Sequence, residues 1–150
     1  MEVLPIPYSD LLKMQRCACG NLRKTTRSIT QFYDRSLQST GLRSTQYSLL
    51  INIALYGNIS VGELGIRLLM DQTTVTRNIE ILRKYGYIRI VKEENDARKK
   101  SISITKEGEK KLEEALPLWE KAQAHIEEGL GVGRLDDFLK MLKALEQIAE

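Results

Sequence analysis

The sequence is poor in the residues that most catalytic and metal sites need. It has one histidine, His125, and two cysteines, Cys17 and Cys19. A structural zinc site takes four such ligands, and nucleophilic catalysis needs a nucleophile beside its base. The glycines at positions 129, 131 and 133 lack the preceding strand of a phosphate-binding loop. We therefore predict no metal, no cofactor and no enzymatic activity.

Long apolar runs are also absent. The longest strictly apolar runs are short, as at residues 53–56, whereas a membrane-spanning helix needs about 20 apolar residues. The first ten residues lack a charged segment followed by an apolar one, so they do not have the pattern of a secretory signal. Two cysteines in such a chain are a poor disulfide framework, and we expect reduced thiols. These absences predict a cytoplasmic protein that has no membrane partner.

Length and charge point to a folded protein with a basic middle. The 150 residues, 42% hydrophobic and 29% charged, suit one compact domain or two small coupled lobes. Residues 41–105 contain ten Lys/Arg and six Asp/Glu, a net charge of +4. Residues 106–150 contain seven basic and eleven acidic residues, a net charge of −4. The middle of the chain is therefore the part suited to a polyanion such as DNA.

Helical periodicity dominates the first half of the chain. Apolar residues recur every three or four positions over about 9–37, which predicts one long helix with a bend or a close contact at Gly20. A second helix is expected over 46–56, with Ser44 as its cap.

Two capping signals follow in the sequence. Ser60 and Glu63 have the spacing of a capping box, which predicts a short third helix. Asp71 is the expected N-cap of a fourth helix that runs to Tyr85 and is closed by Gly86.

The period then changes from helical to alternating. Residues 88–90 and 101–104 alternate isoleucine with polar residues, which predicts two paired strands joined by a polar, solvent-exposed hairpin tip. Two further helices are expected, one starting at Thr105 and kinked by Pro117, and one over 135–149. The predicted fold class is mainly α with a small β-wing: a winged helix-turn-helix with long N- and C-terminal helices.

The fourth predicted helix has the composition of a DNA-reading helix. Its buried stripe turns a polar, mostly basic face outward, and short hydrogen-bonding side chains at its start can read base edges. Arg77 could reach either a guanine or a phosphate. On the wing, Arg98 suits a minor groove, and Asp96 could orient Arg98 or Arg77. The predicted DNA contacts are Ser44, Thr45, Ser60, Gln72, Thr73, Thr74, Thr76, Arg77, Arg83, Asp96, Arg98, Lys99 and Lys100.

At the stretch LLMDQTTVTRNIEILRKYGYIRIVKEENDARKKSISITKEGEK the chain resembles the MarR family of bacterial and archaeal transcription regulators. The resemblance extends over nearly the whole chain. It implies a DNA-binding lobe at about 42–105 and a helical dimerisation lobe formed by about 1–40 and 106–150. It also implies that Thr73, Thr74, Thr76 and Arg77 enter the major groove, with Arg98 as the wing arginine. Members are homodimers that bind palindromic operators, so we expect a sequence-specific regulator that acts as a repressor.

Dimerisation is also expected from the residues. The terminal helices have more apolar face than a winged module of roughly 65 residues can cover. A two-fold axis would place two of the DNA-reading helices about one DNA turn, ~34 Å, apart.

The sequence leaves two alternatives for the signal that controls such a regulator. The resemblance implies a small, often phenolic, anion in a crevice; our candidate ligand contacts are Arg16, Arg23, Arg27, Tyr33, Tyr47 and Trp119. Alternatively, Cys17 and Cys19 sense oxidants. In one helix these two residues would point about 200° apart, which favours a disulfide across the two-fold axis over one within the helix. A rival class is a winged domain for protein contacts or for unspecific DNA coating.

Overall fold

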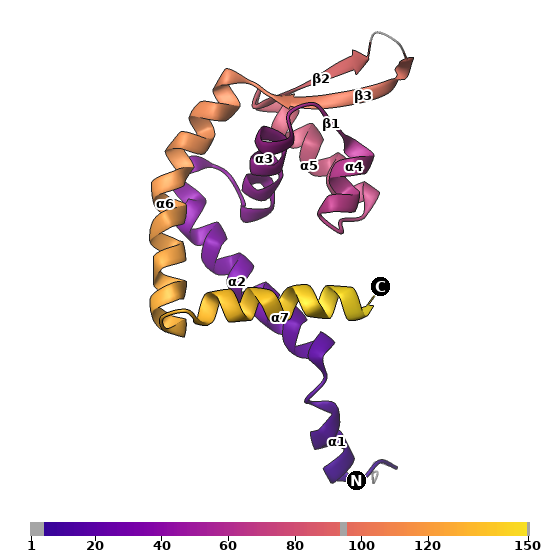
Figure 1. Ribbon diagram of the computed structural model, residues 1–150, viewed down its shortest axis with the longest axis vertical. Helices are drawn as coiled ribbons and strands as arrows, with labels where there is room; N and C mark the ends of the chain where they lie inside the picture. Colours follow the sequence, from indigo (N-terminus) through magenta and orange to yellow (C-terminus); the bar gives the residue numbers. More distant parts are fainter. Residues whose placement is uncertain (1–4, 94–95, 150) are drawn as a thin grey trace.

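The computed structural model describes residues 5–93 and 96–149. Figure 1 shows the elements along the chain. In chain order they are α1 (Tyr8–Met14), α2 (Ala18–Leu37), the 3-10 helix η1 (Gln38–Thr40), α3 (Ser44–Tyr56), β1 (Ile59–Ser60), α4 (Val61–Arg67), α5 (Gln72–Lys84), β2 (Ile88–Glu93), β3 (Asp96–Ile104), α6 (Lys106–Leu130) and α7 (Arg134–Ala149).

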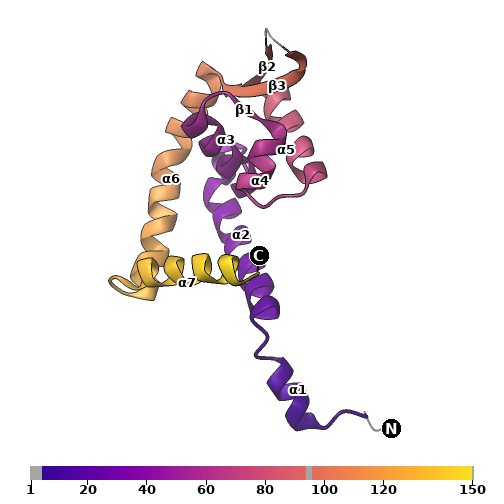
Figure 2. The same cartoon turned by 45° about the vertical axis from the view of Figure 1, so that its right-hand side comes forward.

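The elements divide between a compact end and a helical end. Helices α3, α4 and α5 pack with the sheet at one end of the molecule, and α2 and α6 lie side by side below them (Figure 1). Helix α7 crosses α2, and α1 extends away from the other elements in both views (Figure 2). This arrangement confirms the predicted fold class, mainly α with a small antiparallel sheet. Within residues 5–93 and 96–149 we find no helix whose length and apolar content would let it traverse a bilayer.

The core lies in the compact end. Leu49, Leu50 and Ile53 of α3 are completely buried, as are Leu82 of α5 and Ile102 of β3. Each buried leucine or isoleucine contributes about 1.5–3 kcal/mol by leaving water. The apolar periodicity that predicted these helices therefore reflects one shared core.

The sheet has one more strand than the sequence predicted. Residues Ile88 and Ile90 pair with Ile104 and Ile102, which confirms the expected hairpin. Strand β1 adds to the other edge of β3, with Ile59 opposite Ile102. The two residues of β1 are too few to show a period of two, so no local pattern could predict it.

The first predicted helix is wrong in one respect, because the chain breaks before Gly20 and not at it. Cys17 has φ −56° and ψ 121°, so it lies outside helical geometry as the N-cap of α2. The Nδ2 of Asn21 donates to the carbonyl oxygens of Gln15 and Cys17, at 2.9 Å each. The first bond gives the carbonyl of Gln15, at the end of α1, a donor, whereas the carbonyl of Cys17 also accepts from the Asn21 amide at 3.1 Å. A Cβ at Gly20 would meet Cβ of Cys17 at 4.0 Å, an ordinary contact, so no close helix contact requires a glycine here.

The cap of α3 also differs from the prediction. Arg43 is the N-cap, and its amide donates to Oε1 of Gln46 at 3.1 Å. Ser44 is the first residue of the helix, and both its amide and its hydroxyl donate to Oδ1 of Asp34, at 2.7 Å each. Asp34 lies ten residues earlier on α2, so this contact is tertiary and the capping rules do not anticipate it.

Helix α6 is tightly joined to the compact end at its start. Thr105 is the N-cap, as predicted, and its hydroxyl oxygen accepts from the amide of Gly108 at 3.1 Å. A Cβ at Gly108 would collide with the carbonyl of Tyr87 and lie 2.7 Å from Cγ1 of Ile104. One turn later, Nζ of Lys111 donates to the carbonyl of Thr40 at 3.1 Å. These contacts fix the first turns of α6 to the compact end, and α6 then continues through Pro117.

Candidate nucleic-acid interface

Helix α5 is oriented by its buried stripe and by its cap. Val75, Ile79 and Leu82 are 0–3% exposed and face the core, as the sequence predicted. Asp71 is the N-cap, and its Oδ1 accepts from the amide of Thr74 at 2.9 Å. The cap therefore fixes where the helix starts, and packing of the stripe against the core fixes its rotation.

The opposite face of α5 is exposed and polar. Thr73, Thr76 and Arg77 all lie on this face, where the sequence predicted them. Gln72 is also exposed, and its Nε2 lies 3.5 Å from Oγ1 of Thr76, at the long limit of a hydrogen bond. The structure thus brings together four of the predicted contacts on the first turns of one helix.

Thr74 differs from its neighbours, because it serves the helix cap. Its hydroxyl donates to Oδ2 of Asp71 at 2.6 Å. That hydrogen bond, followed by the bond from the Thr74 amide, lowers the pKa of the Asp71 carboxyl. The hydroxyl hydrogen of Thr74 is therefore committed to the cap.

Arg83 is also engaged within α5. Its Nε and Nη2 donate to the two carboxylate oxygens of Glu80, at 2.9 and 2.7 Å. The same contact lowers the pKa of Glu80 and raises that of Arg83, in both cases chiefly through the side-chain hydrogen bond. Any DNA contact by Arg83 would have to compete with this pair, whereas no hydrogen bond or ion pair involves Arg77 within the described residues.

Three other predicted DNA contacts are less accessible to DNA: Ser44, Thr45 and Ser60. The hydroxyl of Ser44 donates a hydrogen bond to Asp34. Ser60 is the N-cap of α4, and its hydroxyl oxygen accepts from the amide of Glu63 at 3.1 Å. Thr45 is half-buried beside an open hollow of about 350 Å³ at the start of α3 and the α4–α5 turn. The full capping box of α4 does not form, because the Glu63 carboxylate binds Arg67 at 2.9 Å.

The wing is formed by β2 and β3. Lys100 is exposed and pairs in register with Lys92 on the neighbouring strand, which gathers positive charge on the wing. Asp96 begins β3 and is exposed. Arg98 and Lys99 lie within β3, but their side chains fall outside the described part of the structure.

Sequence reasoning missed Arg89 as a candidate. This exposed arginine lies on β2, and its Nε donates to Oγ of Ser103 across the strand pair at 3.0 Å. Its place between Ile88 and Ile90 was the available signal, since alternation turns it away from the core.

The predicted effector residues do not come together. Arg23 and Arg27 line an open hollow of about 540 Å³ between α2 and α7. The hydroxyl of Tyr33 donates to Oε1 of Gln123 at 2.7 Å, and its pKa is raised by burial and then by Glu127. Of the other three candidates, Arg16 is exposed and Trp119 packs against the core. Tyr47 is 7% exposed, and its pKa is raised by burial and then by Glu120.

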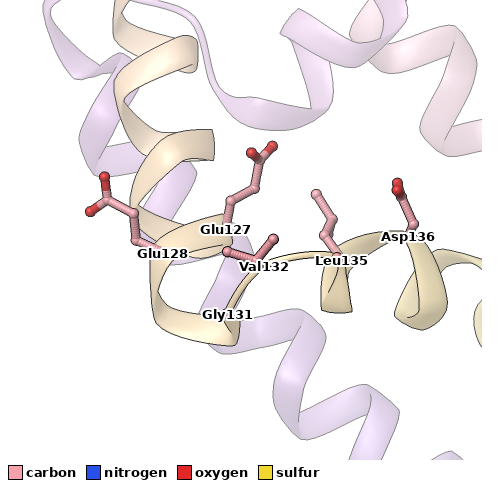
Figure 3. Close-up of a pocket in the computed structure, with 7 residues that line it drawn as sticks. Glu127, Glu128, Gly131, Val132, Leu135 and Asp136 are labelled. Atoms are coloured by element: carbon pink, nitrogen blue, oxygen red, sulfur yellow. The ribbon is translucent and has the colours of Figure 1, made fainter.

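Another hollow lies where α6 turns into α7 and is acidic. It has a volume of about 580 Å³, and its lining includes Glu127, Glu128 and Asp136; Figure 3 shows the carboxylates of Glu127 and Asp136 on the same side of the turn and that of Glu128 pointing away. Figure 1 places this turn at the end of α6 far from the sheet. Its charge is unsuited to phosphate, in agreement with the negative C-terminal third of the sequence.

Both cysteines are exposed free thiols. Cys17 lies at the break between α1 and α2, and Cys19 lies in the first turn of α2 and lines the hollow between α2 and α7. Because Cys17 is outside helical geometry, the expectation that the two side chains point about 200° apart does not apply.

A capped helix with an exposed polar face, a preceding short helix and a basic two-stranded wing define a winged helix-turn-helix DNA-binding protein. The model of the MarR family matches residues 42–100. The transcriptional regulator MosR of M. tuberculosis, solved in complex with DNA, is 35% identical, with a TM-score of 0.75 over 90% of this chain and 99% of MosR. The uncharacterized regulator YwoH of Bacillus subtilis is 32% identical over 93 residues, 62% of this chain and 67% of YwoH.

The chain belongs to the MarR family, and it is a DNA-binding transcriptional regulator. Regulators of this family are not enzymes, in agreement with the prediction from the sequence. A structure of BpsR from Bordetella bronchiseptica, which addresses regulation of its DNA binding by 6-hydroxynicotinic acid, shares the fold at 20% identity, with a TM-score of 0.79 over 95% of this chain and 98% of BpsR. The first curated relatives are matched over 60–67% of their own lengths.

Proposed function

We propose that this regulator binds as a homodimer to an operator of two inverted half-sites and represses transcription there. The observation that carries the proposal is the exposed face of α5, where Thr73, Thr76 and Arg77 project from a helix fixed by its cap and its buried stripe. Such a face fits a major groove, in which threonine and arginine side chains reach base edges and phosphates. The wing, with Arg98, Lys99 and Lys100, would lie along the neighbouring minor groove.

The helical end supports the dimer. No residue of α7 is buried, and Phe138, Leu139 and Leu145 are 37%, 51% and 39% exposed. In α2 the one buried residue is Leu37. Helices with apolar faces this exposed need a partner, and a two-fold axis supplies the same face from a second copy. Residues 1–40 and 106–150 would then form the dimerisation lobe, and 42–105 the DNA-binding lobe.

The experiment that tests this proposal is selection of bound duplexes from a random pool by the purified full-length chain. We expect an inverted repeat with half-site centres about 10 bp apart. Binding to the selected site should survive an excess of unrelated duplex, with a specificity of ~10³ or more. A chain that recovers no motif and is displaced equally by every duplex would instead be a DNA-coating or protein-contact module.

We propose further that a small aromatic anion lowers the affinity for DNA. Support comes from the exposed cations of α2 and, at the level of the fold, from BpsR and 6-hydroxynicotinic acid. A ligand can act only if it binds one spacing of the two α5 helices better than another. Titration of 6-hydroxynicotinate into the operator complex, followed by fluorescence anisotropy, should release DNA. Unchanged anisotropy across a panel of hydroxylated aromatic acids would remove this part of the proposal.

A redox signal is the second candidate, and the exposure of both thiols favours it. Peroxide would convert one thiol to a sulfenic acid with release of water, and the second thiol would then displace a second water to form the disulfide. Since Cys17 is non-helical, the helical geometry that disfavours a disulfide within one chain does not apply, and the experiment has to distinguish it from a disulfide between chains. Non-reducing gels and mass spectrometry after peroxide treatment, with Cys17→Ser and Cys19→Ser as controls, distinguish the two. Unchanged mass and unchanged DNA affinity would exclude redox sensing.

A further inference from the structure

We propose that Leu69, in the turn between α4 and α5, packs on the methyl group of a thymine and so favours this base at one position of each half-site. This inference rests on the DNA-binding face of α5 proposed above and adds a residue from outside that helix. Two observations carry it: the backbone of Leu69 has a conformation that leucine rarely adopts, and the residue is 78% exposed.

Two backbone hydrogen bonds close the turn between α4 and α5. The amide of Leu69 donates to the carbonyl of Ile66 at 3.2 Å. The amide of Met70 donates to the carbonyl of Gly65 at 2.9 Å. This pair of bonds is the Schellman ending of a helix, in which the residue after the C-cap takes left-handed geometry and is usually glycine. Leu68 is the C-cap of α4, so Leu69 occupies the glycine position, with φ 50°.

Leucine is strained at this position and is held there from both sides. Within residues 5–93 and 96–149 it is the one residue other than glycine that has a positive φ, a geometry in which its Cβ crowds the backbone. On the α4 side, a Cβ at Gly65 would lie 3.3 Å from the carbonyl oxygen of Met70, so the turn packs closely on the helix. On the α5 side, Asp71 is fixed as the N-cap. The turn therefore has little room to relax.

The side chain of Leu69 does not offset this strain within its own chain. Its neighbours Leu68 and Met70 are partly buried against the core, whereas Leu69 remains exposed. An apolar side chain stabilises a fold by leaving water, and this one stays largely in water. Strained residues cluster at functional sites, where the strain serves the function. A strained and exposed leucine therefore points to a contact outside the single chain.

The position of Leu69 favours DNA as its partner. Leu69 lies two residues before Asp71, and the exposed residues Gln72 and Thr73 follow the cap directly. Figure 1 shows α4 and α5 side by side, joined by this turn. The start of a recognition helix is the end that contacts base edges, so Leu69 continues the surface proposed for DNA. The methyl group of thymine is the apolar group that a major groove displays, which matches a leucine.

Substitutions of Leu69 in the full-length chain separate its side chain from its backbone. Leu69→Gly removes the contact and relieves the strain, so it should bind the selected operator about fivefold more weakly or worse, with an unchanged or higher midpoint of thermal unfolding. Leu69→Asn tolerates the same backbone but is polar, and it should bind as weakly as Leu69→Gly. Leu69→Met stays apolar and should bind within about threefold of wild type. Leu55→Ala is the control, because it removes a leucine that is 73% exposed near the end of α3 and should leave the affinity unchanged.

Removal of the methyl group from the DNA tests the partner of Leu69. Each thymine of the selected operator is replaced in turn by deoxyuridine, in both half-sites, and fluorescence anisotropy measures the affinity. At one position we expect wild type to bind about three- to fourfold more weakly for each methyl group removed. Leu69→Gly should bind the thymine and deoxyuridine duplexes equally, because either change removes the same contact.

The outcomes separate this contact from the proposed DNA-binding face. A Leu69→Gly protein with wild-type affinity overturns the thymine contact. So does a set of deoxyuridine duplexes that wild type and Leu69→Gly distinguish equally. In both cases a loss of affinity in Arg77→Ala leaves the α5 face standing. If neither Leu69→Gly nor Arg77→Ala lowers the affinity, the assignment of this face to DNA is itself wrong.

Discussion

Replacing Arg77 by alanine is the sharpest test of the α5 face. The guanidinium of Arg77 is exposed and lacks a hydrogen-bond or ion-pair partner within the described residues, so nothing in the protein has to be broken before it contacts DNA. The side chain stands opposite the buried stripe, so its removal should leave the free energy of unfolding nearly unchanged. Any loss of operator binding then reports on the interface.

The expected size of the loss depends on what Arg77 contacts. A dimer contains two copies of the residue. If each neutralises one phosphate, Arg77→Ala lowers the slope of log affinity against log salt by about 1.8, from ~0.9 per phosphate. If each instead makes a bidentate contact to guanine, each loss costs about 1–3 kcal/mol, and discrimination at that base falls. Arg77→Lys separates the cases, because lysine keeps a phosphate contact and loses the bidentate one.

Fluorescence anisotropy with the selected operator at four or more salt concentrations measures both quantities. Arg83→Ala is the matched control on the same helix, since Arg83 is already bound by Glu80. We expect a smaller change in slope for Arg83→Ala than for Arg77→Ala. An Arg77→Ala protein with wild-type affinity, slope and base preference, or a larger effect at Arg83, would refute the assignment of this face to DNA.

Four further predictions concern stability, the wing and base reading by α5. Gly108→Ala should destabilise the fold by about 1–3 kcal/mol, because the added Cβ would collide with the carbonyl of Tyr87. Gly129→Ala, where the same helix has open space, should be neutral or stabilising. Chemical denaturation measures the free energy of unfolding of both variants. The pKa of the Asp71 carboxyl is lowered in the folded state, so its contribution to stability is present above the unfolded pKa of about 3.9. This contribution is lost as the pH falls through the lower folded pKa. In thermal unfolding, the advantage of wild type over Asp71→Asn should therefore shrink below about pH 4. An advantage that is constant down to pH 2 would contradict this. Arg98→Ala should weaken operator binding and flatten its salt dependence. Thr73→Ala should alter base preference more than overall affinity. Fluorescence anisotropy measures both effects, and an equal loss of affinity of Thr73→Ala for every DNA sequence would argue against base reading.

Much of the DNA-binding lobe could be predicted because its signals are local. The stripe of Val75, Ile79 and Leu82 and the cap at Asp71 lie within a few turns of one helix, and the structure confirms both. The pairing of the two strands also follows from alternation, which fixes the inner face of each strand. The polar outward face of α5 is the complement of that stripe, so its exposure followed from the same pattern.

The candidate effector residues show where local signals stop. Arg23, Tyr33 and Trp119 were grouped because their helices were expected to face one crevice; in the single chain Arg23 lines an open hollow, Tyr33 bonds Gln123, and Trp119 packs against the core. Which side chains share a cavity depends on how helices cross and rotate against one another. A helical period gives the face of each helix and not its neighbour.

The sequence alone determined most of the helices, the caps at Ser60, Asp71 and Thr105, the paired strands and the outward face of α5, because each follows from a pattern within one segment of the chain. The tertiary structure decided the third strand, the contact of Ser44 with Asp34, and the outward direction of α1 at a break held by Asn21. It also decided that α7 leaves its apolar face open. Each of these features depends on a contact between two different elements, whose free energy is set by how the elements pack and not by the period or propensity of either one.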